Sequence, residues 1–162
     1  MSALFKTSSL LTAGQTAPDF ELKSQDGETV SLYKALQRGW VVLFFYPKDH
    51  SPVCTTEVCT FRDAYGDFRE TGAELLGISE DSEESHRAFS QKQRLPFPLL
   101  CDPGGAVAKR YGVSKALGLI PGRATFVIDP QHTVRLAYSD LLNGKAHTEK
   151  ALQLLRQQHP NL

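Results

Sequence analysis

Apolar residues occur along this chain in short runs that are separated by polar turns, as in a sheet covered by helices. Residues 41–46, with the sequence VVLFFY, are six apolar or aromatic residues in a row. A run of this length is typical of a central strand that is buried on both faces. Pro47 ends the run, and Ser51-Pro52 is a helix-start signature, because serine caps helices and proline fits the first helical position. The pattern therefore predicts a buried strand over residues 41–46 and a helix from about residue 52.

The helix predicted after Pro52 has one apolar face. Its apolar side chains recur at steps of three and four residues, the spacing of an amphipathic helix, at Val58, Phe61, Tyr65 and Phe68. Cys54 heads this face, and Cys59 belongs to the opposite one. A cysteine among apolar residues is most often an inert small hydrophobe. In the first helical turn, however, unpaired N–H groups and the helix dipole favour the thiolate, so we predict that Cys54 is a redox-active nucleophile.

The rest of the chain predicts a mixed sheet with helices packed on it. Residues 19–23 and 29–32 form a hairpin around an Asp-Gly turn, and Ser31 caps a short helix to residue 37. Residues 73–79 give a second buried strand, so that strand, cysteine helix and strand make a right-handed βαβ unit. The later elements are a helix over 82–92, a strand over 99–101, a helix over 105–111, strands over 124–129 and 133–138, and a helix over 148–158.

This order predicts an α/β protein with a thioredoxin-like fold, in which helices flank a central mixed β-sheet and a β-hairpin lies toward the N-terminus. With 162 residues, 41% of them hydrophobic, the chain has enough apolar residues for one domain over residues 1–162. Residues 1–14 lack a continuous apolar core of signal-peptide length, and we expect an irregular leader or an extra strand there.

Composition and charge argue against several classes of function. The chain has 18 basic and 18 acidic residues and no basic cluster, so we expect neither nucleic-acid binding nor attachment to an anionic membrane. No apolar run approaches the ~20 residues of a membrane-spanning helix. Three cysteines, an odd number, suit catalytic thiols in a reducing compartment, and we expect the cytoplasm.

The histidines do not indicate a metal site. All five lack the spacing of a zinc motif, so we expect no metal and no cofactor: His50, His86, His132, His147 and His159. His50 lies four residues before Cys54 and could contact the thiolate, although a solvated loop histidine is the more frequent case. Cys101 is expected to be a buried spectator rather than a redox partner.

The cysteine segment carries a family resemblance. FYPKDHSPVCTTEVCTFRD resembles the active-site segment of the peroxiredoxins, in which a proline, a threonine or serine and the peroxidatic cysteine match Pro47, Ser51 and Cys54. A second cysteine five residues later is similar to the Q-type subgroup, also called bacterioferritin comigratory proteins, and Cys59 matches it. APDFEL, FPLLCDPGGAVAKRYGV and RATFVID follow in the family's order, so that the resemblance covers about residues 18–155.

The resemblance implies a thiol peroxidase that reduces hydrogen peroxide and small organic hydroperoxides. It implies that Cys54 is the peroxidatic cysteine and Cys59 the resolving cysteine, joined in an intramolecular disulfide that a thioredoxin-like dithiol donor reduces. It also assigns Ser51 and Arg123 to the peroxide and the thiolate, with Pro47 in support. Glu57 aligns with a family glutamate that pairs with an arginine, although a plain exposed helix acid fits nearly as well. We expect a monomer.

Three residues depart from the family pattern. Val53 stands where glycine is usual, Ser51 replaces the commoner threonine, and Cys101 occupies a position often held by serine. None of these changes removes a catalytic group. Serine lacks the methyl group that holds a threonine hydroxyl in one rotamer, so we expect effects on substrate preference and rate rather than on the class of reaction.

Two other functions stay open at this point. A thiol–disulfide oxidoreductase would normally carry CxxC, whereas this chain has CxxxxC. A redox-sensing or chaperone-like protein would form the disulfide without sustained turnover.

The spacing of the two cysteines predicts a conformational change. Five residues along an α-helix place the two Cα atoms roughly 8.6 Å apart, on faces that differ by ~140°. A disulfide needs Cα atoms about 4.4 to 6.8 Å apart. If both cysteines are helical in the reduced protein, the segment from Pro52 to about Cys59 must therefore unwind before Cys54 and Cys59 can bond.

Overall fold

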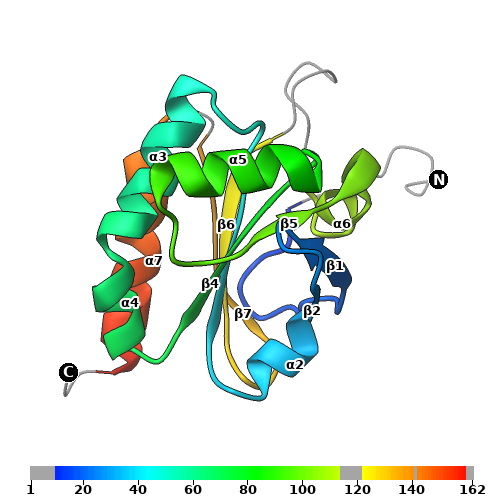
Figure 1. Cartoon of the computed structure of the whole chain (residues 1–162). Helices are drawn as coiled ribbons and strands as arrows, with labels where there is room; N and C mark the ends of the chain where they lie inside the picture. The colour runs from blue at the N-terminus through cyan, green and yellow to red at the C-terminus, as the bar shows by residue number, and fades with distance from the viewer. Residues whose placement is uncertain (1–9, 114–121, 141, 160–162) are drawn as a thin grey trace.

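The computed structural model describes residues 10–113, 122–140 and 142–159 of the chain. Within these ranges, helices pack around a twisted sheet of seven strands (Figure 1). The strands are β1 (Glu21–Ser24), β2 (Thr29–Ser31), β3 (Val41–Phe45), β4 (Glu74–Ser79), β5 (Leu99–Cys101), β6 (Ala124–Ile128) and β7 (Val134–Ser139). The helices are α2 (Leu32–Leu36), α3 (Pro52–Asp63), α4 (Tyr65–Glu70), α5 (Glu83–Gln93), α6 (Ala106–Arg110) and α7 (Gly144–Gln158), with the 3₁₀ turn η1 (Pro103–Gly105) before α6.

The sheet is mixed and has the strand order β2-β1-β5-β4-β3-β6-β7. Strand β3 runs parallel to β4 and antiparallel to β6, so both of its edges are paired. Strand β5 extends the parallel part, and the hairpins β1–β2 and β6–β7 form the two outer edges. This arrangement confirms the predicted thioredoxin-like α/β fold, with its central mixed sheet, flanking helices and N-terminal hairpin.

The position of β3 explains why its sequence is apolar throughout. Successive side chains of a strand point to opposite faces of the sheet. Val41, Leu43 and Phe45 enter a core that α2 and α6 cover, whereas Val42 and Phe44 enter a second core under α3, α4, α5 and α7. All five residues are buried. The protein is therefore built in three layers, with helices on both faces of the sheet.

The helix after Cys54 is less regular than its sequence predicts. Helix α3 ends just before Ala64, whose φ of −93° and ψ of 4° separate it from α4. The apolar stripe continues across this break, because Val58, Phe61 and Phe68 are all buried in the same core. The prediction of one continuous helix is therefore wrong, while the predicted buried face is correct.

Helix α7 begins at Gly144 rather than at the predicted residue 148. Asn143 caps it by accepting a hydrogen bond from the Ala146 N–H at 3.1 Å. Gly144 is buried against α3, where a Cβ atom would lie 2.9 Å from the Cβ of Glu57. Glycine disfavours helices, which hid this start in the sequence, but it lets α7 approach α3 closely.

The first described residues pack on the core without forming a helix or a strand. Leu10 and Leu11 contact the core under α2 and α6, and the Leu11 N–H donates to the Tyr111 carbonyl at 3.1 Å. Residues 1–9, where most of the predicted leader falls, lie outside the described residues.

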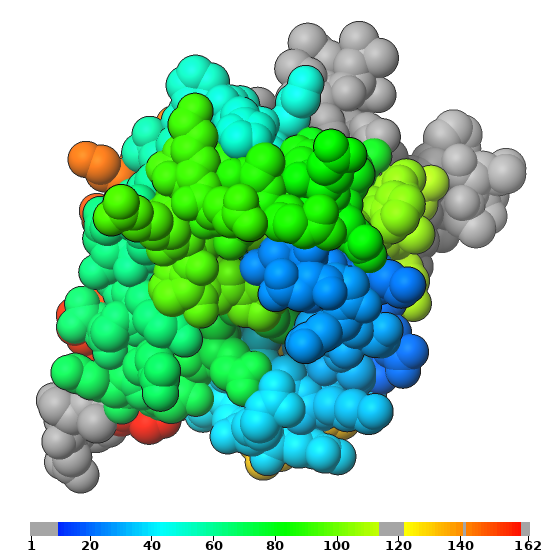
Figure 2. All heavy atoms as spheres, in the orientation of Figure 1, coloured from blue at the N-terminus to red at the C-terminus, as the bar shows by residue number. Residues whose placement is uncertain are grey.

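On the face of the molecule that Figure 2 shows, α5 and the hairpin β1–β2 lie side by side. Within the described ranges, no helix is both long enough and apolar enough to cross a membrane.

Candidate active site

Cys54 lies where the chain leaves the central strand and enters α3. The Tyr46 N–H still bonds to the Ile78 carbonyl of β4 at 3.0 Å, and Pro47 then turns the chain across the carboxyl edge of the parallel strands. Pro52 is the first residue of α3, so Cys54 is the third and belongs to the first turn, as predicted. Its side chain is buried in the core beneath α3.

The first turn of α3 contains backbone donors that have no acceptor within the helix. The first bond of the helical ladder joins the Thr55 N–H to the Ser51 carbonyl at 2.8 Å, so the N–H groups of Val53 and Cys54 precede that ladder. Ser51 occupies the N-cap position, but its hydroxyl donates to the Lys48 carbonyl at 3.1 Å. The predicted capping bond is therefore wrong. The free N–H groups and the helix dipole favour an anionic sulfur here.

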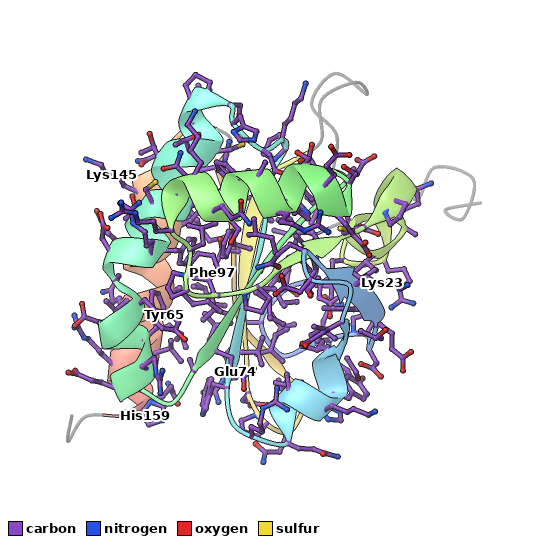
Figure 3. All side chains as sticks on the ribbon, viewed as in Figure 1. Lys23, Tyr65, Glu74, Phe97, Lys145 and His159 are labelled. Carbon is purple, nitrogen blue, oxygen red and sulfur yellow. The ribbon has the colours of Figure 1, made fainter. Side chains whose placement is uncertain are left out.

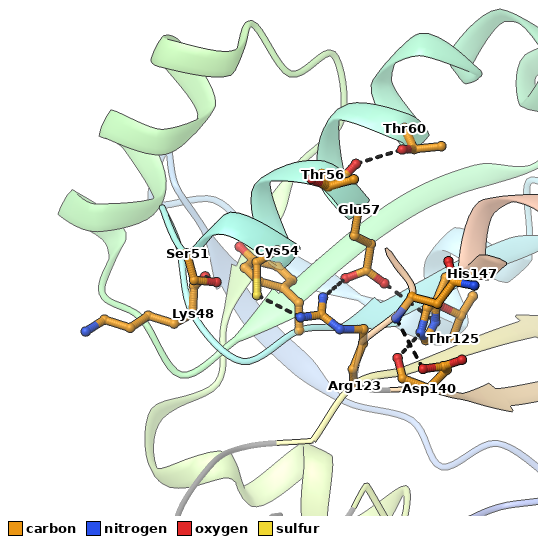
Figure 4. Close-up of polar contacts among 12 residues, drawn as sticks. Lys48, Ser51, Cys54, Thr56, Glu57, Thr60, Arg123, Thr125, Asp140 and His147 are labelled. Atoms are coloured by element: carbon orange, nitrogen blue, oxygen red, sulfur yellow. Dashed lines mark hydrogen bonds and ion pairs between the residues drawn. The ribbon is translucent and has the colours of Figure 1, made fainter. Parts of the chain in front are cut away.

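Arg123 reaches the sulfur because of the register of the sheet. Ala124, the first residue of β6, pairs with Phe45, the last residue of β3. Arg123 directly precedes Ala124 and therefore stands beside the start of α3. Its guanidinium is almost fully buried, and its Nη2 donates to the Cys54 Sγ at 3.2 Å (Figure 4). A fixed cation at this distance stabilises a thiolate.

Glu57 lies one turn after Cys54 on the buried face of α3, so the alternative of an exposed helix acid is wrong. Its Oε1 accepts a hydrogen bond from Arg123 Nη1 at 2.5 Å. Burial raises the pKa of Glu57 to about 8, although the neighbouring Arg123 opposes this shift. The same guanidinium thus contacts both the sulfur of Cys54 and a carboxyl group.

Two further polar residues extend this cluster, and the sequence did not reveal either of them. His147 on α7 is buried, and its Nδ1 lies 2.7 Å from Thr125 Oγ1 and 3.5 Å from Glu57 Oε2. Its Nε2 donates to the Asp140 carbonyl at 2.8 Å. Burial lowers the pKa of His147. The spacing of the histidines tells only of metal sites, and the sequence pattern predicts a start of α7 after His147. The observed start at Gly144 places His147 on the helix that packs against α3.

The loop before α3 is anchored by a buried ion pair. His86 Nδ1 lies 2.7 Å from Asp49 Oδ2, and His86 Nε2 lies 3.0 Å from the Leu100 carbonyl. Both partners are acceptors, so both ring nitrogens carry a proton and the ring has no lone pair left for a metal ion. Burial opposes ionisation of Asp49, but its hydrogen bond with His86 holds the pKa of Asp49 below the ordinary value. Asp49, Asp81 and His86 converge, but these bonds make them an anchor for the loop.

Cys59 lies on the same helix as Cys54, and its sulfur is turned toward α5. Its Sγ donates to Gln93 Oε1 at 3.2 Å, and Arg62 donates to the Gln93 carbonyl at 2.8 Å. Burial raises the pKa of Cys59. Cys54 and Cys59 are both free thiols and both helical. The condition for the predicted unwinding, that both cysteines are helical when reduced, is therefore met.

Neither His50 nor Cys101, both in the described part of the chain, forms a hydrogen bond with the sulfur of Cys54. The His50 side chain is exposed, and its ring packs edge-on against Phe89 of α5 with a centroid distance of 4.9 Å. Cys101 ends β5, and burial raises the pKa of its thiol to about 11. A thiol with so high a pKa is a poor nucleophile near neutral pH.

A separate hollow lies at the opposite end of the sheet. A cavity of about 360 Å³ opens between α4 and the beginning of β4, where Tyr65, Glu74 and Phe97 line it (Figure 3). Glu74 is the first residue of β4, whereas Cys54 lies beyond the carboxyl end of β3. This cavity is therefore not part of the site around Cys54.

Comparison with known proteins gives a consistent set of relatives. Residues 13–137 match the model of the AhpC/TSA family. The chain is 46% identical over 147 residues to "Peroxiredoxin Q, chloroplastic" of Sedum lineare, which covers 90% of this chain and 78% of that protein. It is also 46% identical over 144 residues to the Arabidopsis thaliana protein of the same name, covering 88% of this chain and 66% of the relative.

Solved structures show the same fold. The crystal structure of peroxidoxin BcpB from Mycobacterium tuberculosis superposes with a TM-score of 0.85 at 41% identity and covers 91% of this chain and 97% of its own. Peroxiredoxin Q of Xanthomonas campestris superposes with a TM-score of 0.80 at 30% identity, covering 94% of this chain and 98% of its own.

Proposed function

This chain belongs to the AhpC/TSA family and, within it, to the peroxiredoxin Q group of thiol peroxidases, and we propose that Cys54 is the cysteine that its peroxide substrate oxidises. The observation that carries this proposal is the contact between Arg123 Nη2 and the Cys54 Sγ at 3.2 Å. It places a buried cation on a sulfur that already stands at a helix start, and both features favour the reactive thiolate.

The first step is an in-line attack on the peroxide. The Cys54 thiolate forms a bond to the terminal peroxide oxygen, the O–O bond breaks, and the alkoxide or hydroxide leaves and takes up a proton. Cys54 becomes a sulfenic acid, and the peroxide becomes an alcohol or water. Arg123 and the N–H groups of Val53 and Cys54 stabilise the charge that develops on the oxygens. The Ser51 hydroxyl donates to the Lys48 carbonyl, so its oxygen is able to accept the peroxide O–H.

The second step forms the disulfide. The Cys59 thiol attacks the sulfenic sulfur of Cys54 and releases water, which gives an intramolecular Cys54–Cys59 disulfide. Both residues lie in α3, where their Cα atoms stand roughly 8.6 Å apart on an ideal helix. Unwinding of the first turns of α3 brings them within bonding distance and exposes the disulfide.

A dithiol of the thioredoxin type then reduces the disulfide by thiol exchange and restores two thiols. The two cysteine thiols supply the two electrons that reduce the peroxide, so the cycle needs no bound cofactor. We assign hydrogen peroxide and small organic hydroperoxides as substrates. We also infer a monomer, because Leu142 is the one large hydrophobic side chain that is strongly exposed in the described part of the chain. Plant relatives are named chloroplastic; for this chain we propose a reducing compartment, the cytoplasm, where its three thiols stay reduced.

Steady-state consumption of hydrogen peroxide with a thioredoxin system tests the assignment on three serine variants. Cys54→Ser is expected to abolish turnover, because no other thiol combines a helix start with a guanidinium contact. Cys59→Ser is expected to form one equivalent of dimedone-trappable sulfenic acid and then to stall or overoxidise. Cys101→Ser is the matched control and should keep wild-type turnover. Substantial turnover of Cys54→Ser would overturn the proposal, and full turnover of Cys59→Ser would remove Cys59 from it.

A further inference from the structure

One oxygen of the buried carboxyl group beside the active site has no hydrogen-bond partner. Glu57 is completely buried, and its Oε1 accepts from Arg123, but Oε2 receives no hydrogen bond from any described residue although solvent does not reach it. A buried carboxylate oxygen without a donor costs free energy. His147 Nδ1 lies 3.5 Å from this oxygen, at the outer limit of a hydrogen bond.

The hydrogen bonds of His147 define its tautomer. Nε2 lies 2.8 Å from the Asp140 carbonyl, which can only accept, so Nε2 carries a proton. A neutral ring then presents a lone pair at Nδ1, toward both the Thr125 hydroxyl and Glu57 Oε2. Thr125 can donate to that lone pair, whereas a carboxylate oxygen cannot. The contact with Glu57 becomes attractive only if one additional proton lies on Oε2 or on Nδ1.

Charge balance around Arg123 leads to the same requirement. One guanidinium contacts two groups that are able to carry a negative charge, the Cys54 sulfur through Nη2 and the Glu57 carboxyl through Nη1. If both were anionic and His147 were neutral, the buried cluster would carry an uncompensated negative charge, which is unfavourable at low dielectric. An additional proton on Glu57 or His147 removes this excess.

Among the described residues, the other groups that face Glu57 and His147 do not supply a positive charge that would compensate the excess. His147 packs edge-on against the Tyr138 ring at 4.9 Å and is near Asp140, whose charge is negative. Gly144 of α7 packs against the Cβ of Glu57 and offers no side chain. The ordinary pKa values of both partners are shifted by burial, upward for Glu57 and downward for His147, so each neutral form is favoured.

We propose that Glu57 and His147 hold one proton between Oε2 and Nδ1, so that the pair carries no net charge and the positive charge of Arg123 stabilises the Cys54 thiolate. His147 is then a positioning residue, which acts on the sulfur through Glu57 and Arg123. The inference rests on the proposed role of Cys54 and deepens it. It also gives α7 a part in the chemistry of a cysteine on α3.

The direct test is the ¹⁵N resonance of His147 Nδ1 in the reduced wild-type protein, followed from pH 6 to 10. We expect Nδ1 to shift as the pair loses its proton near the pKa of about 8 that burial gives Glu57. In Glu57→Gln this transition should vanish, because the amide N–H of glutamine can donate to Nδ1 at every pH. A wild-type resonance that does not move, or a transition that persists in Glu57→Gln, would overturn the proposal.

A second test asks whether Glu57 competes with the sulfur for Arg123. Alkylation of Cys54 by iodoacetamide is measured against pH in a Cys59→Ser/Cys101→Ser background. A neutral glutamine beside His147 has the same net charge as a Glu57–His147 pair that holds one proton. Glu57→Gln should therefore keep the half-maximal pH of alkylation within about 0.3 unit of the parent value. The exposed control Glu149→Gln should do the same. A fall of about one unit or more would mean that Glu57 is an anion at neutral pH, and would refute the pair.

The two proposals fail in different ways. If Cys54 were not the peroxidatic residue, Cys54→Ser would keep its turnover while the His147 transition still appeared. If the shared proton were absent, turnover would still depend on Cys54, but the Nδ1 resonance would not respond to pH. The resonance of the wild-type protein decides the second question even if Glu57→Gln does not fold.

Discussion

At the sulfur of Cys54, the proposed reactivity depends on three groups that come from two parts of the chain, helix α3 and the residue before β6. The helix start supplies two N–H groups, the residue before β6 supplies a guanidinium, and Glu57 holds that guanidinium in place. The shape of Arg123 is as important as its charge. Its two terminal nitrogens contact a sulfur and a carboxyl oxygen at the same time, which an ammonium group at the end of a flexible stem does not reproduce.

Arg123→Lys is therefore expected to lower kcat/KM for peroxide by about 100-fold, the cost of one lost donor at a developing oxyanion. Stopped-flow peroxide consumption measures the loss. Arg135→Lys is the matched control, because Arg135 makes its ion pair with Asp129 far from the sulfur. A loss of less than about threefold in Arg123→Lys would show that charge alone is sufficient.

The residues of this site differ in how visible they are in the sequence. Cys54, Ser51 and Arg123 are marked by a local motif or by a family landmark, so their neighbourhood could be predicted. His147 has no local signal, because its role depends on an unexpected helix start and on the close approach at Gly144. The hydroxyl of Ser51 shows the opposite case, in which the predicted position was right and the predicted bond was wrong.

At the scale of elements, two helices contact α3 near its two cysteines. Helix α7 packs against Glu57, near Cys54, whereas Gln93 at the end of α5 holds the Cys59 thiol and Arg62. Formation of the proposed Cys54–Cys59 disulfide would break the contacts with α5, because Cys59 would have to leave Gln93. The hydrogen bond between Cys59 and Gln93 of α5 therefore opposes the local unfolding that the proposed catalytic cycle requires.

Gln93→Ala is expected to form the disulfide about fivefold faster after one equivalent of peroxide, because a typical hydrogen bond contributes about 1 kcal/mol. Amide exchange of the reduced variant should be faster across residues 52–59 and unchanged across residues 41–46. Stopped-flow fluorescence and mass spectrometry measure the two effects. Gln91→Ala, an exposed position on the same helix, serves as the control. Equal rates in Gln93→Ala and wild type would mean that α5 does not restrain Cys59.

The elements themselves were largely predictable, because buried strands and amphipathic helices leave strong patterns. The break at Ala64 was not, since the apolar stripe continues across it. The pattern records which face is buried, and it does not record whether the backbone between two buried residues stays helical.

At the scale of the whole molecule, the strand order determines where the site forms. A run of βαβ and hairpin elements predicts a mixed sheet, but local patterns do not place β1 beside β5 or β6 beside β3. Those pairings depend on contacts between distant segments. The β3–β6 pairing brings Arg123 next to Cys54, 69 residues away in the chain. The resemblance could name Arg123, while only the fold explains its position.

The buried carboxyl of Glu57 also makes global stability depend on pH. Its pKa is raised from an ordinary value of 4.5 to about 8, so between these values the folded state holds a proton that the unfolded state releases. The free energy of unfolding that Glu57 contributes is therefore complete below pH 4.5 and is lost as pH rises through 8. His147 has a lowered pKa and acts in the opposite direction, but only below its ordinary value of 6.5. Above pH 6.5 the effect of Glu57 should appear without that of His147.

Cys54→Ser is the background in which this pH dependence is measured, because the substitution removes the thiol that shares the Arg123 guanidinium with Glu57. In Cys54→Ser, the free energy of unfolding from urea titrations should fall between pH 6.5 and 8 by up to about 1.4 kcal/mol per pH unit, the limit for one proton. Cys54→Ser/Glu57→Gln should lose this slope, since glutamine does not titrate. If the free energy of unfolding of Cys54→Ser/Glu57→Gln fell equally steeply with pH, the effect would belong to another group. If the free energy of unfolding of Cys54→Ser did not change with pH, Glu57 would already be ionised at pH 6.5 in the folded protein.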